Sequence, residues 1–222
     1  MNYSAVVFDM DGTILNTLDD LAAATNFALE ANRLPLRTTE DVRRFVGNGV
    51  RRLVERAVPG ETPPSVMDAV YADFSAYYAK HCADRTKPYD GMKELLSRLR
   101  TAGIKTAVVS NKDDYAVQTL ARVYFPALFD AVVGVREGIK KKPAPDTVYE
   151  VMARLAVGKE QCIYVGDSEV DIETARNAGI PCVSVSWGFK GRPFLQEHNA
   201  VTIVDTAAEL SAVLMCRSPC EP

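Results

Sequence analysis

The chain has 222 residues, of which 47% are hydrophobic and 25% charged, a composition typical of a folded globular protein. Its formal net charge of −3 argues against a general binder of nucleic acids or membrane surfaces. No apolar run approaches the roughly 20 residues that cross a bilayer. Two histidines and five scattered cysteines exclude a His-rich or thiolate metal site, and we expect free thiols in a reducing cytoplasm.

The first predicted element is a strand over residues 5–8, Ala-Val-Val-Phe, which is apolar on both alternating faces. Such a pattern is typical of a strand that is covered on both sides, as in a parallel sheet. Asp9 and Asp11 follow it directly, and two carboxylates this close repel each other unless a cation or a substrate uses them. The simpler alternative is a hairpin, in which Asp11-Gly12 turns the chain back into a second strand over residues 13–15.

Residues 15–84 have helical periodicity throughout, with apolar residues at helical spacing over 18–29, 42–57 and 66–78. Thr38 and Asp41 have the spacing of a capping box at the start of a helix. Gly47-Asn48-Gly49 interrupts that helix, and Ser65 is predicted to cap the last one. We therefore expect an all-helical insertion at 15–84, between the parts 1–14 and 85–222 of a core domain.

From Pro88 onward, strands alternate with helices. This alternation is typical of right-handed βαβ units, so we predict an α/β fold with a doubly wound parallel sheet. We expect the tail from Arg217 to be frayed. Strands are predicted at 106–109, 131–133, 162–165, 182–185 and 201–204, and helices at 92–102, 117–121, 148–155, 171–178 and 207–215, with Gly103 and Gly179 as left-handed caps.

Polar side chains follow several of these strands, and ligands of open α/β sheets bind at the carboxyl ends of the strands. The residues in these positions are Asp9, Asp11, Ser110, Lys142, Asp167 and Asp171. Taken singly, a serine or an aspartate here is an ordinary helix-capping residue, and the run 140–142 is a solvated lysine loop. Gathered on one edge they indicate a functional site, which the hairpin alternative does not anticipate.

Carboxylate oxygens without histidine or thiolate predict a hard divalent cation, most simply Mg²⁺. With Lys142 and Ser110 beside it, such a cation would make a pocket for a dianionic phosphoryl group. The residues therefore predict phosphoryl transfer on a small phosphorylated metabolite, without nucleic acid or membrane as partner. A monomer and a homodimer are both compatible with the sequence.

Four ordered motifs resemble those of the haloacid dehalogenase superfamily over essentially the whole chain: "DMDGT" from Asp9, Ser110 at a strand end, Lys142 before proline, and "GDSEVD" from Gly166. The resemblance implies that residues 15–84 are the α-helical cap of that superfamily. "FVGNGVRRLVERA" from Phe45 and "VSNK" from Val109, with the extended last motif, are similar to the bacterial phosphoglycolate phosphatase branch. This narrower resemblance implies 2-phosphoglycolate as the substrate.

The resemblance also implies roles for individual residues. Asp9 would be the nucleophile that forms an aspartyl phosphate, and Asp11 the general acid and base. Ser110 would bind a phosphoryl oxygen, and Lys142 would neutralise charge there and on Asp9. The metal ligands would be Asp9, the main-chain carbonyl of Asp11, and Asp167, with Asp171 supporting them. Further residues expected around the phosphate are Gly12, Thr13, Asn111 and Ser168, and those of a cap loop over the leaving group are Gly47, Asn48, Gly49 and Arg51.

Several alternatives remain beside this interpretation. An acid at position 11 disfavours a dehalogenase, and Lys80 as the only lysine in 15–84 disfavours a phosphonate hydrolase with a Schiff-base lysine. A sugar phosphomutase and a pyrophosphatase stay open. A phosphoaspartate receiver domain has its acid pair and phosphoacceptor on different strands and no place for the helical insertion. An inactive binding protein on a phosphatase scaffold would have lost Asp9 or Asp11.

Overall fold

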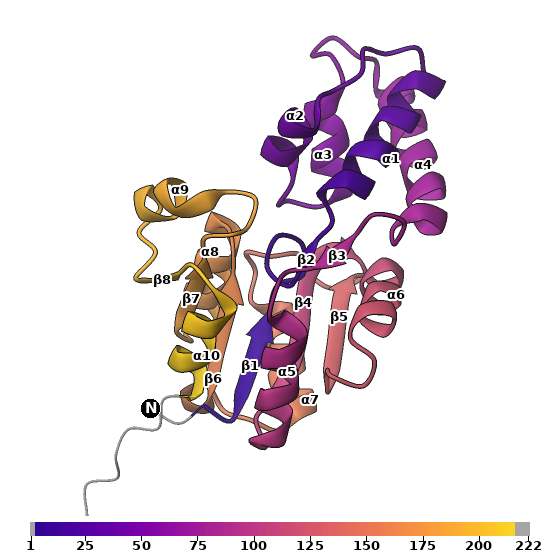
Figure 1. Ribbon diagram of the computed structural model, residues 1–222. Helices are drawn as coiled ribbons and strands as arrows, with labels where there is room; N and C mark the ends of the chain where they lie inside the picture. Colours follow the sequence, from indigo (N-terminus) through magenta and orange to yellow (C-terminus); the bar gives the residue numbers. More distant parts are fainter. Residues whose placement is uncertain (1–2, 216–222) are drawn as a thin grey trace, which may run out of the picture.

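Six parallel strands form the central sheet in the computed structural model, which describes residues 3–215 (Figure 1). Their order across the sheet is β5-β4-β1-β6-β7-β8. The predicted frayed tail from Arg217 lies outside the described residues. The strands are β1 (Ala5–Phe8), β4 (Lys105–Asp113), β5 (Ala131–Val135), β6 (Cys162–Gly166), β7 (Cys182–Val185) and β8 (Thr202–Val204).

Strand β1 lies in the middle of this sheet, and all four of its residues are fully buried. Phe8 is in register with Val108 of β4 and Val165 of β6, so the residues that follow these strands emerge at one edge. The predicted parallel strand is confirmed. The hairpin alternative is wrong, because both neighbours of β1 are distant parallel strands.

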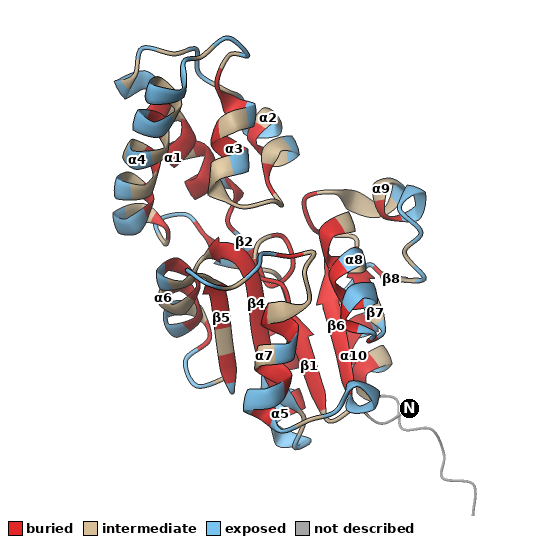
Figure 2. Cartoon of the chain, turned by 180° about the vertical axis from the view of Figure 1, so that it is seen from behind, coloured by how far each residue is buried: buried red, intermediate tan, exposed pale blue. Residues whose placement is uncertain are grey.

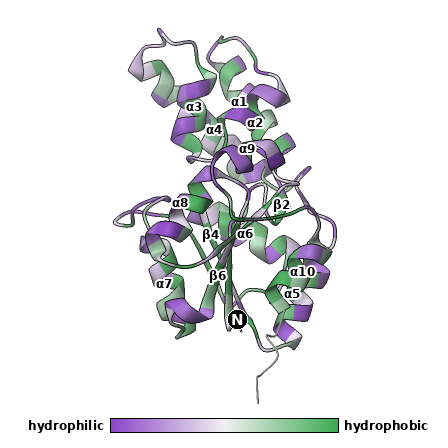
Figure 3. Cartoon of the chain, turned by 90° about the vertical axis from the view of Figure 1, so that its left-hand side faces the viewer, coloured by the Kyte–Doolittle hydropathy of each residue, from purple (hydrophilic) through white to green (hydrophobic). Residues whose placement is uncertain are grey.

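Helices cover both faces of the sheet, as predicted for a doubly wound fold. Val6 and Phe8 pack in one core with helices α5 (Met92–Thr101), α6 (Asp114–Tyr124) and α10 (Ala207–Met215). Ala5 and Val7 point to the other face, towards α7 (Asp146–Leu155) and α8 (Glu169–Ala178). Figure 3 shows this layering, with apolar strands β4 and β6 between α7 and α8 on one side and α5 and α10 on the other. The strands are buried almost throughout, whereas the helices expose their outer faces (Figure 2).

Four helices lie between β1 and α5 in the sequence and form a bundle beyond one end of the sheet (Figure 1). They are α1 (Leu18–Ala31), α2 (Thr39–Phe45), α3 (Val50–Ala57) and α4 (Pro64–His81). The capping box of Thr38 and Asp41 is confirmed. The predicted cap at Ser65 is wrong: α4 starts one residue earlier, at Pro64, where proline's missing N–H costs no hydrogen bond.

Two short strands connect the bundle to the sheet. Leu15–Asn16 (β2) pairs antiparallel with Lys87–Pro88 (β3), so the outgoing and returning segments lie side by side. Buried Asp20, near the start of α1, accepts hydrogen bonds from the backbone of Arg85 and Thr86 at 2.8–3.0 Å. The two segments that connect the bundle to the sheet are thus hydrogen-bonded to each other.

Several features differ from the predicted elements. The expected all-helical segment begins with the short strand β2, and its partner strand β3 was not predicted either. Strand β4 continues to Asp113, with a shift of register against β5 after Val109, so Ser110 lies inside the strand and not beyond it. Helix α9 (Gly191–Glu197) and a 3-10 turn (Lys159–Gln161) were not predicted, because glycine, proline and short length hide their periodicity. Within residues 3–215, no helix has the length and apolarity to span a bilayer.

Candidate active site

A cavity lies at the carboxyl edge of the sheet, beneath the loop between α2 and α3. It brings together most of the predicted site residues. The core lines it with Asp9, Asp11, Ser110, Asn111, Lys112, Lys142, Asp167, Ser168, Phe189 and Lys190, and the helical bundle with Leu21, Val46, Gly47, Gly49, Val50 and Leu53. The predicted residues Gly12, Thr13, Asp171, Asn48 and Arg51 are outside this lining.

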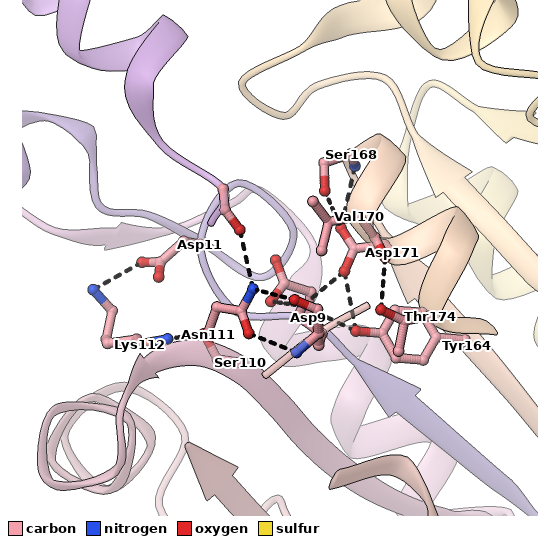
Figure 4. Close-up of polar contacts among 12 residues, drawn as sticks. Asp9, Asp11, Ser110, Asn111, Lys112, Tyr164, Ser168, Val170, Asp171 and Thr174 are labelled. Atoms are coloured by element: carbon pink, nitrogen blue, oxygen red, sulfur yellow. Dashed lines mark hydrogen bonds and ion pairs between the residues drawn. The ribbon is translucent and has the colours of Figure 1, made fainter. Parts of the chain in front are cut away.

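The centre of the site is the ammonium of Lys142, which lies between the carboxylates of Asp9 and Asp171. Figure 4 shows these two acids with Tyr164 and Ser168 beside them. Nζ of Lys142 lies 2.7 Å from Oδ1 of Asp9 and 2.7 Å from Oδ1 of Asp171. It also donates to the Tyr164 hydroxyl at 3.0 Å, and that hydroxyl donates to Asp171. All four side chains are buried. Lys142, on a loop with no regular structure, is therefore fixed against the end of β1 by groups from β6 and α8.

Burial and charge shift the titration of these groups. Burial raises the pKa of Asp9 to about 7, repulsion from Asp171 and Asp11 adds to this rise, and Lys142 opposes it. Burial alone would lower the pKa of Lys142, but the carboxylates of Asp171 and Asp9 raise it well above the ordinary lysine value. Lys142 therefore stays protonated. Its single positive charge does not balance the negative charges of the acids around it.

Asp167 follows β6, and its side chain is held by a backbone hydrogen bond and by two closely packed glycines from different loops. Its Oδ2 accepts the backbone N–H of Phe189 at 2.7 Å. A Cβ atom at Gly188 would lie 2.3 Å from the Asp167 side chain, and one at Gly12, whose φ is +86°, would also lie 2.3 Å from it. Only glycine fits at either position. Burial, with repulsion from Asp171 and Asp9, raises the pKa of Asp167 well above its usual range.

These acids suit a hard divalent cation. Asp9, Asp167 and Asp171 each place a carboxylate oxygen within 4.8 Å of the others, and all three are buried. Both oxygens of Asp171 are already used, Oδ1 by Lys142 and Oδ2 by the N–H and hydroxyl of Ser168. Oδ2 of Asp9 and Oδ1 of Asp167 accept no hydrogen bond from residues 3–215. The all-oxygen donor set and its excess of negative charge therefore fit Mg²⁺, with Asp9 and Asp167 as ligands and Asp171 behind them.

The side chain of Asp11 points away from this cluster, towards the helical bundle. Its Oδ1 accepts the Thr17 hydroxyl at 2.6 Å. The same oxygen lies 3.2 Å from Nζ of Lys112 (Figure 4). Lys112 is buried and also donates to the Tyr78 hydroxyl of α4 at 2.8 Å. Burial would lower the pKa of Lys112, but Asp11 and Tyr78 raise it above the ordinary lysine value. This pair of charges was not predicted, although "VSNK" contains the lysine.

Ser110 and Asn111 lie in β4 with their side chains at the cavity. The Ser110 hydroxyl accepts the backbone N–H of Lys112 at 3.2 Å, which leaves its proton for another acceptor. The Asn111 amide bonds both backbone groups of Lys142, at 2.9 and 3.1 Å, and donates to the Gly47 carbonyl at 3.3 Å. Asn111 thus positions the Lys142 loop and touches the loop between α2 and α3.

Two residues of the predicted cap loop do not face the cavity. Asn48 accepts a hydrogen bond from Arg56, which also bonds the Phe45 carbonyl. Arg51 pairs with Asp68 at 2.6 Å and lies over the Tyr71 ring. Both are engaged within the bundle, so the predicted use of Arg51 for substrate capture is not supported by its position.

The other predicted residues surround the site. Thr13 is fully buried, and its hydroxyl has no hydrogen-bond partner within the described chain. Its carbonyl accepts the indole N–H of Trp187 at 3.0 Å. Phe189 and Lys190 line the cavity, although neither was predicted as a site residue. No signal in the sequence marks them, because they follow β7 in a segment without a recognisable motif.

The comparisons with known proteins agree with this geometry. A family profile described as haloacid dehalogenase-like hydrolase matches residues 6–185. The chain belongs to this family. It is thus a hydrolase of the haloacid dehalogenase fold, and the receiver-domain alternative is excluded.

Several individual relatives carry the name or the description phosphoglycolate phosphatase. The phosphoglycolate phosphatase of Pseudomonas savastanoi pv. phaseolicola is 34% identical over 208 residues, which cover 90% of this chain and 76% of that one. The phosphoglycolate phosphatase of Thiobacillus denitrificans is 30% identical over 95% of each chain. A crystal structure from Lactobacillus delbrueckii subsp. bulgaricus, provisionally described as a phosphoglycolate phosphatase, has a TM-score of 0.92 and 40% identity, covering 98% of this chain and 100% of that one.

Proposed function

We propose that this hydrolase is a Mg²⁺-dependent phosphatase that cleaves a small phosphomonoester, with 2-phosphoglycolate as the substrate. One observation carries the proposal. Asp9, Asp11, Ser110 and Lys142 open to a single cavity, in which Asp9 and Asp167 fit a divalent cation. The names of the relatives supply the choice of 2-phosphoglycolate.

Asp9 would act as the nucleophile. Its Oδ1 is held by Lys142, so the carboxylate has a fixed direction while Oδ2 remains unbonded. In the first step, an Asp9 oxygen forms a bond to phosphorus as the bond from phosphorus to the ester oxygen breaks, which gives an aspartyl phosphate. The ammonium of Lys142 and the hydroxyl proton of Ser110 stabilise the charge on the phosphoryl oxygens during this step.

Asp11 is placed to transfer the protons. It would give a proton to the departing alkoxide and then take one from the water that attacks the aspartyl phosphate, so that orthophosphate leaves and Asp9 is restored. The ammonium of Lys112 lies 3.2 Å from Asp11 Oδ1 and holds the side chain beside the cavity. The side chain reaches the reacting oxygens by rotating away from Thr17 and Lys112.

Asp9, Asp167 and the main-chain carbonyl of Asp11 would hold the Mg²⁺ ion. When bound, it supplies positive charge that offsets the repulsion between these acids and the incoming phosphate. Asp171 would keep Lys142 and Ser168 in position behind this shell, since both of its oxygens are engaged by them.

Residues 15–84 would act as a cap domain on a core of residues 1–14 and 85–222. The bundle supplies the apolar wall of the cavity, and its connections lie at the paired strands β2 and β3. Cavity closure by this wall would exclude water from the aspartyl phosphate until the leaving group departs.

The test is a phosphate-release assay with Mg²⁺ over 2-phosphoglycolate, pyrophosphate, sugar phosphates and nucleoside monophosphates. The proposal expects the highest kcat/KM for 2-phosphoglycolate and no release by Asp9→Asn, the matched control. A preference for pyrophosphate, or conversion of a sugar phosphate to its isomer without phosphate release, would replace it by the corresponding alternative activity. Absence of turnover on all four classes would contradict it.

A further inference from the structure

Three ammonium groups line the cavity, and they differ in their partners. Lys142 is bound by Asp9 and Asp171, and Lys112 lies beside Asp11. Lys190 makes no ion pair within residues 3–215. Its Nζ lies 5.4 Å from the centre of the Phe194 ring and 3.5 Å from the carbonyl oxygen of Arg44 in α2. Lys190 is thus a half-buried cation at the cavity whose charge no described carboxylate neutralises.

The backbone at Lys190 is fixed relative to the phosphate site. The residue before it, Phe189, donates its N–H to Asp167, and Gly188 packs directly against that same side chain. Lys190 therefore directly follows the residue whose N–H is bonded to Asp167, a predicted metal ligand. Its ammonium ends beside Arg44 of the bundle, so it lies in the gap between the core and the wall over the leaving group.

The bundle itself offers no free cation to the cavity. Its lining residues are apolar side chains and glycines, from Leu21 to Leu53. The described arginines around the α2–α3 loop all have partners and are absent from the lining: Arg43 and Arg44 pair with Glu40, Arg51 with Asp68 and Glu55, Arg52 with Glu55, and Arg56 with the Phe45 carbonyl and Asn48.

A leaving group that carries a carboxylate needs a cation when it is enclosed between apolar walls, because an unpaired buried charge is costly. We propose that Lys190 binds this carboxylate and so selects short phosphomonoesters whose leaving alcohol bears an acid group. The inference rests on the proposed phosphatase function and deepens it. On binding, the ammonium exchanges its weak contacts with the Arg44 carbonyl and the Phe194 ring for a charge-assisted hydrogen bond.

The test compares two substrates that differ only at the proposed contact: 2-phosphoglycolate and 2-hydroxyethyl phosphate, in which a hydroxymethyl group replaces the carboxylate. For each enzyme variant, the measured quantity is the ratio of the two kcat/KM values. Effects on the shared phosphoryl group cancel in this ratio. Lys190→Met should lower the ratio by about tenfold to a hundredfold, the effect of one hydrogen bond to a charged group, mainly through the KM for 2-phosphoglycolate.

Matched variants control for general electrostatics and packing. Lys190→Arg keeps the charge and should retain most of the preference, whereas a merely structural lysine would show no such rescue. Lys140→Met removes an exposed lysine outside the cavity lining and should leave the ratio unchanged. Lys141→Met removes the other nearby lysine, whose Nζ would lie 3.7 Å from a Cβ at Gly49, and should also leave it unchanged.

The outcomes separate this inference from the proposed function. If wild type prefers 2-phosphoglycolate and Lys190→Met lowers both substrates equally, the phosphatase proposal stands and the role of Lys190 is refuted. A loss of preference in Lys141→Met but not in Lys190→Met would refute it as well. If wild type hydrolyses both esters without preference, carboxylate selection itself is refuted, and if it hydrolyses no phosphomonoester, the proposed function fails.

Discussion

Replacing Lys142 by methionine removes the one ammonium that separates Asp9 from Asp171. The change keeps the length and apolar stem of the side chain but deletes two contacts of 2.7 Å and one of 3.0 Å. The lysine is only 6% exposed, so water does not replace it as a partner. Two buried carboxylates are then left facing each other.

The substitution should change both the free energy of unfolding and kcat. Loss of one member of a buried ion pair costs about 3–5 kcal/mol of unfolding free energy, and the lower end applies here because Asp9, whose pKa is already about 7, can take up a proton. Loss of a preorganised positive charge at the reacting phosphoryl group lowers kcat by about 10²- to 10³-fold. Lys142→Met should therefore be both less stable and nearly inactive.

The assay pairs denaturant unfolding without metal with phosphate release at saturating Mg²⁺. Lys141→Met is the matched control, because this neighbouring lysine is exposed and makes no ion pair within the described chain, so its stability should change by about 0.5 kcal/mol or less. If the two variants kept kcat values within about threefold of each other, a specific role for Lys142 would be refuted, and the run 140–142 would act as a diffuse positive patch.

Three further predictions follow from the site. Asp11→Asn should lower kcat by about 10²- to 10⁴-fold for a poor leaving group and less for an aryl phosphate, and rapid steady-state hydrolysis of the poor leaving group would remove Asp11 from the acid–base role. Exhaustive chelation should abolish phosphate release and Mg²⁺ should restore it, whereas activity that survives chelation would rule out the metal site. Arg51→Ala should leave kcat/KM for 2-phosphoglycolate within about threefold of wild type, because its guanidinium is paired with Asp68 outside the cavity, and a selective loss on this substrate would show that Arg51 reaches it after all.

The sequence predicted the parts of the fold that depend on short-range pattern. Residues 5–8 are apolar at every position because β1 is covered on both faces, and the alternation after Pro88 reflects the connections of a parallel sheet. Elements whose formation depends on tertiary contacts were missed. Helix α9 has glycine and proline in its first turn, and β4 continues past Val109 through an irregular register with β5.

In the candidate site, too, the residues that follow a sequence pattern were predicted and those placed by tertiary contacts were missed. Asp9, Ser110, Lys142 and Asp167 were predicted because each follows or ends a strand at the ligand-binding edge, and the structure brings them together. Lys190 could not be predicted, since tertiary contacts such as the bond from Phe189 to Asp167 bring its segment into the cavity. Arg51 was expected there because of the family resemblance of the cap loop, but helix α3 turns it towards Asp68 of α4.

The measurement that tests the central claim most directly is trapping of the covalent intermediate. Turnover of 2-phosphoglycolate with Mg²⁺ is quenched with borohydride, which reduces an aspartyl phosphate to homoserine, and the peptide that contains residues 9–11 is sequenced by mass spectrometry. The account predicts homoserine at Asp9, none at Asp11, and none in the absence of substrate. Sustained phosphate release without any modification at Asp9, or with the modification at another aspartate, would contradict it.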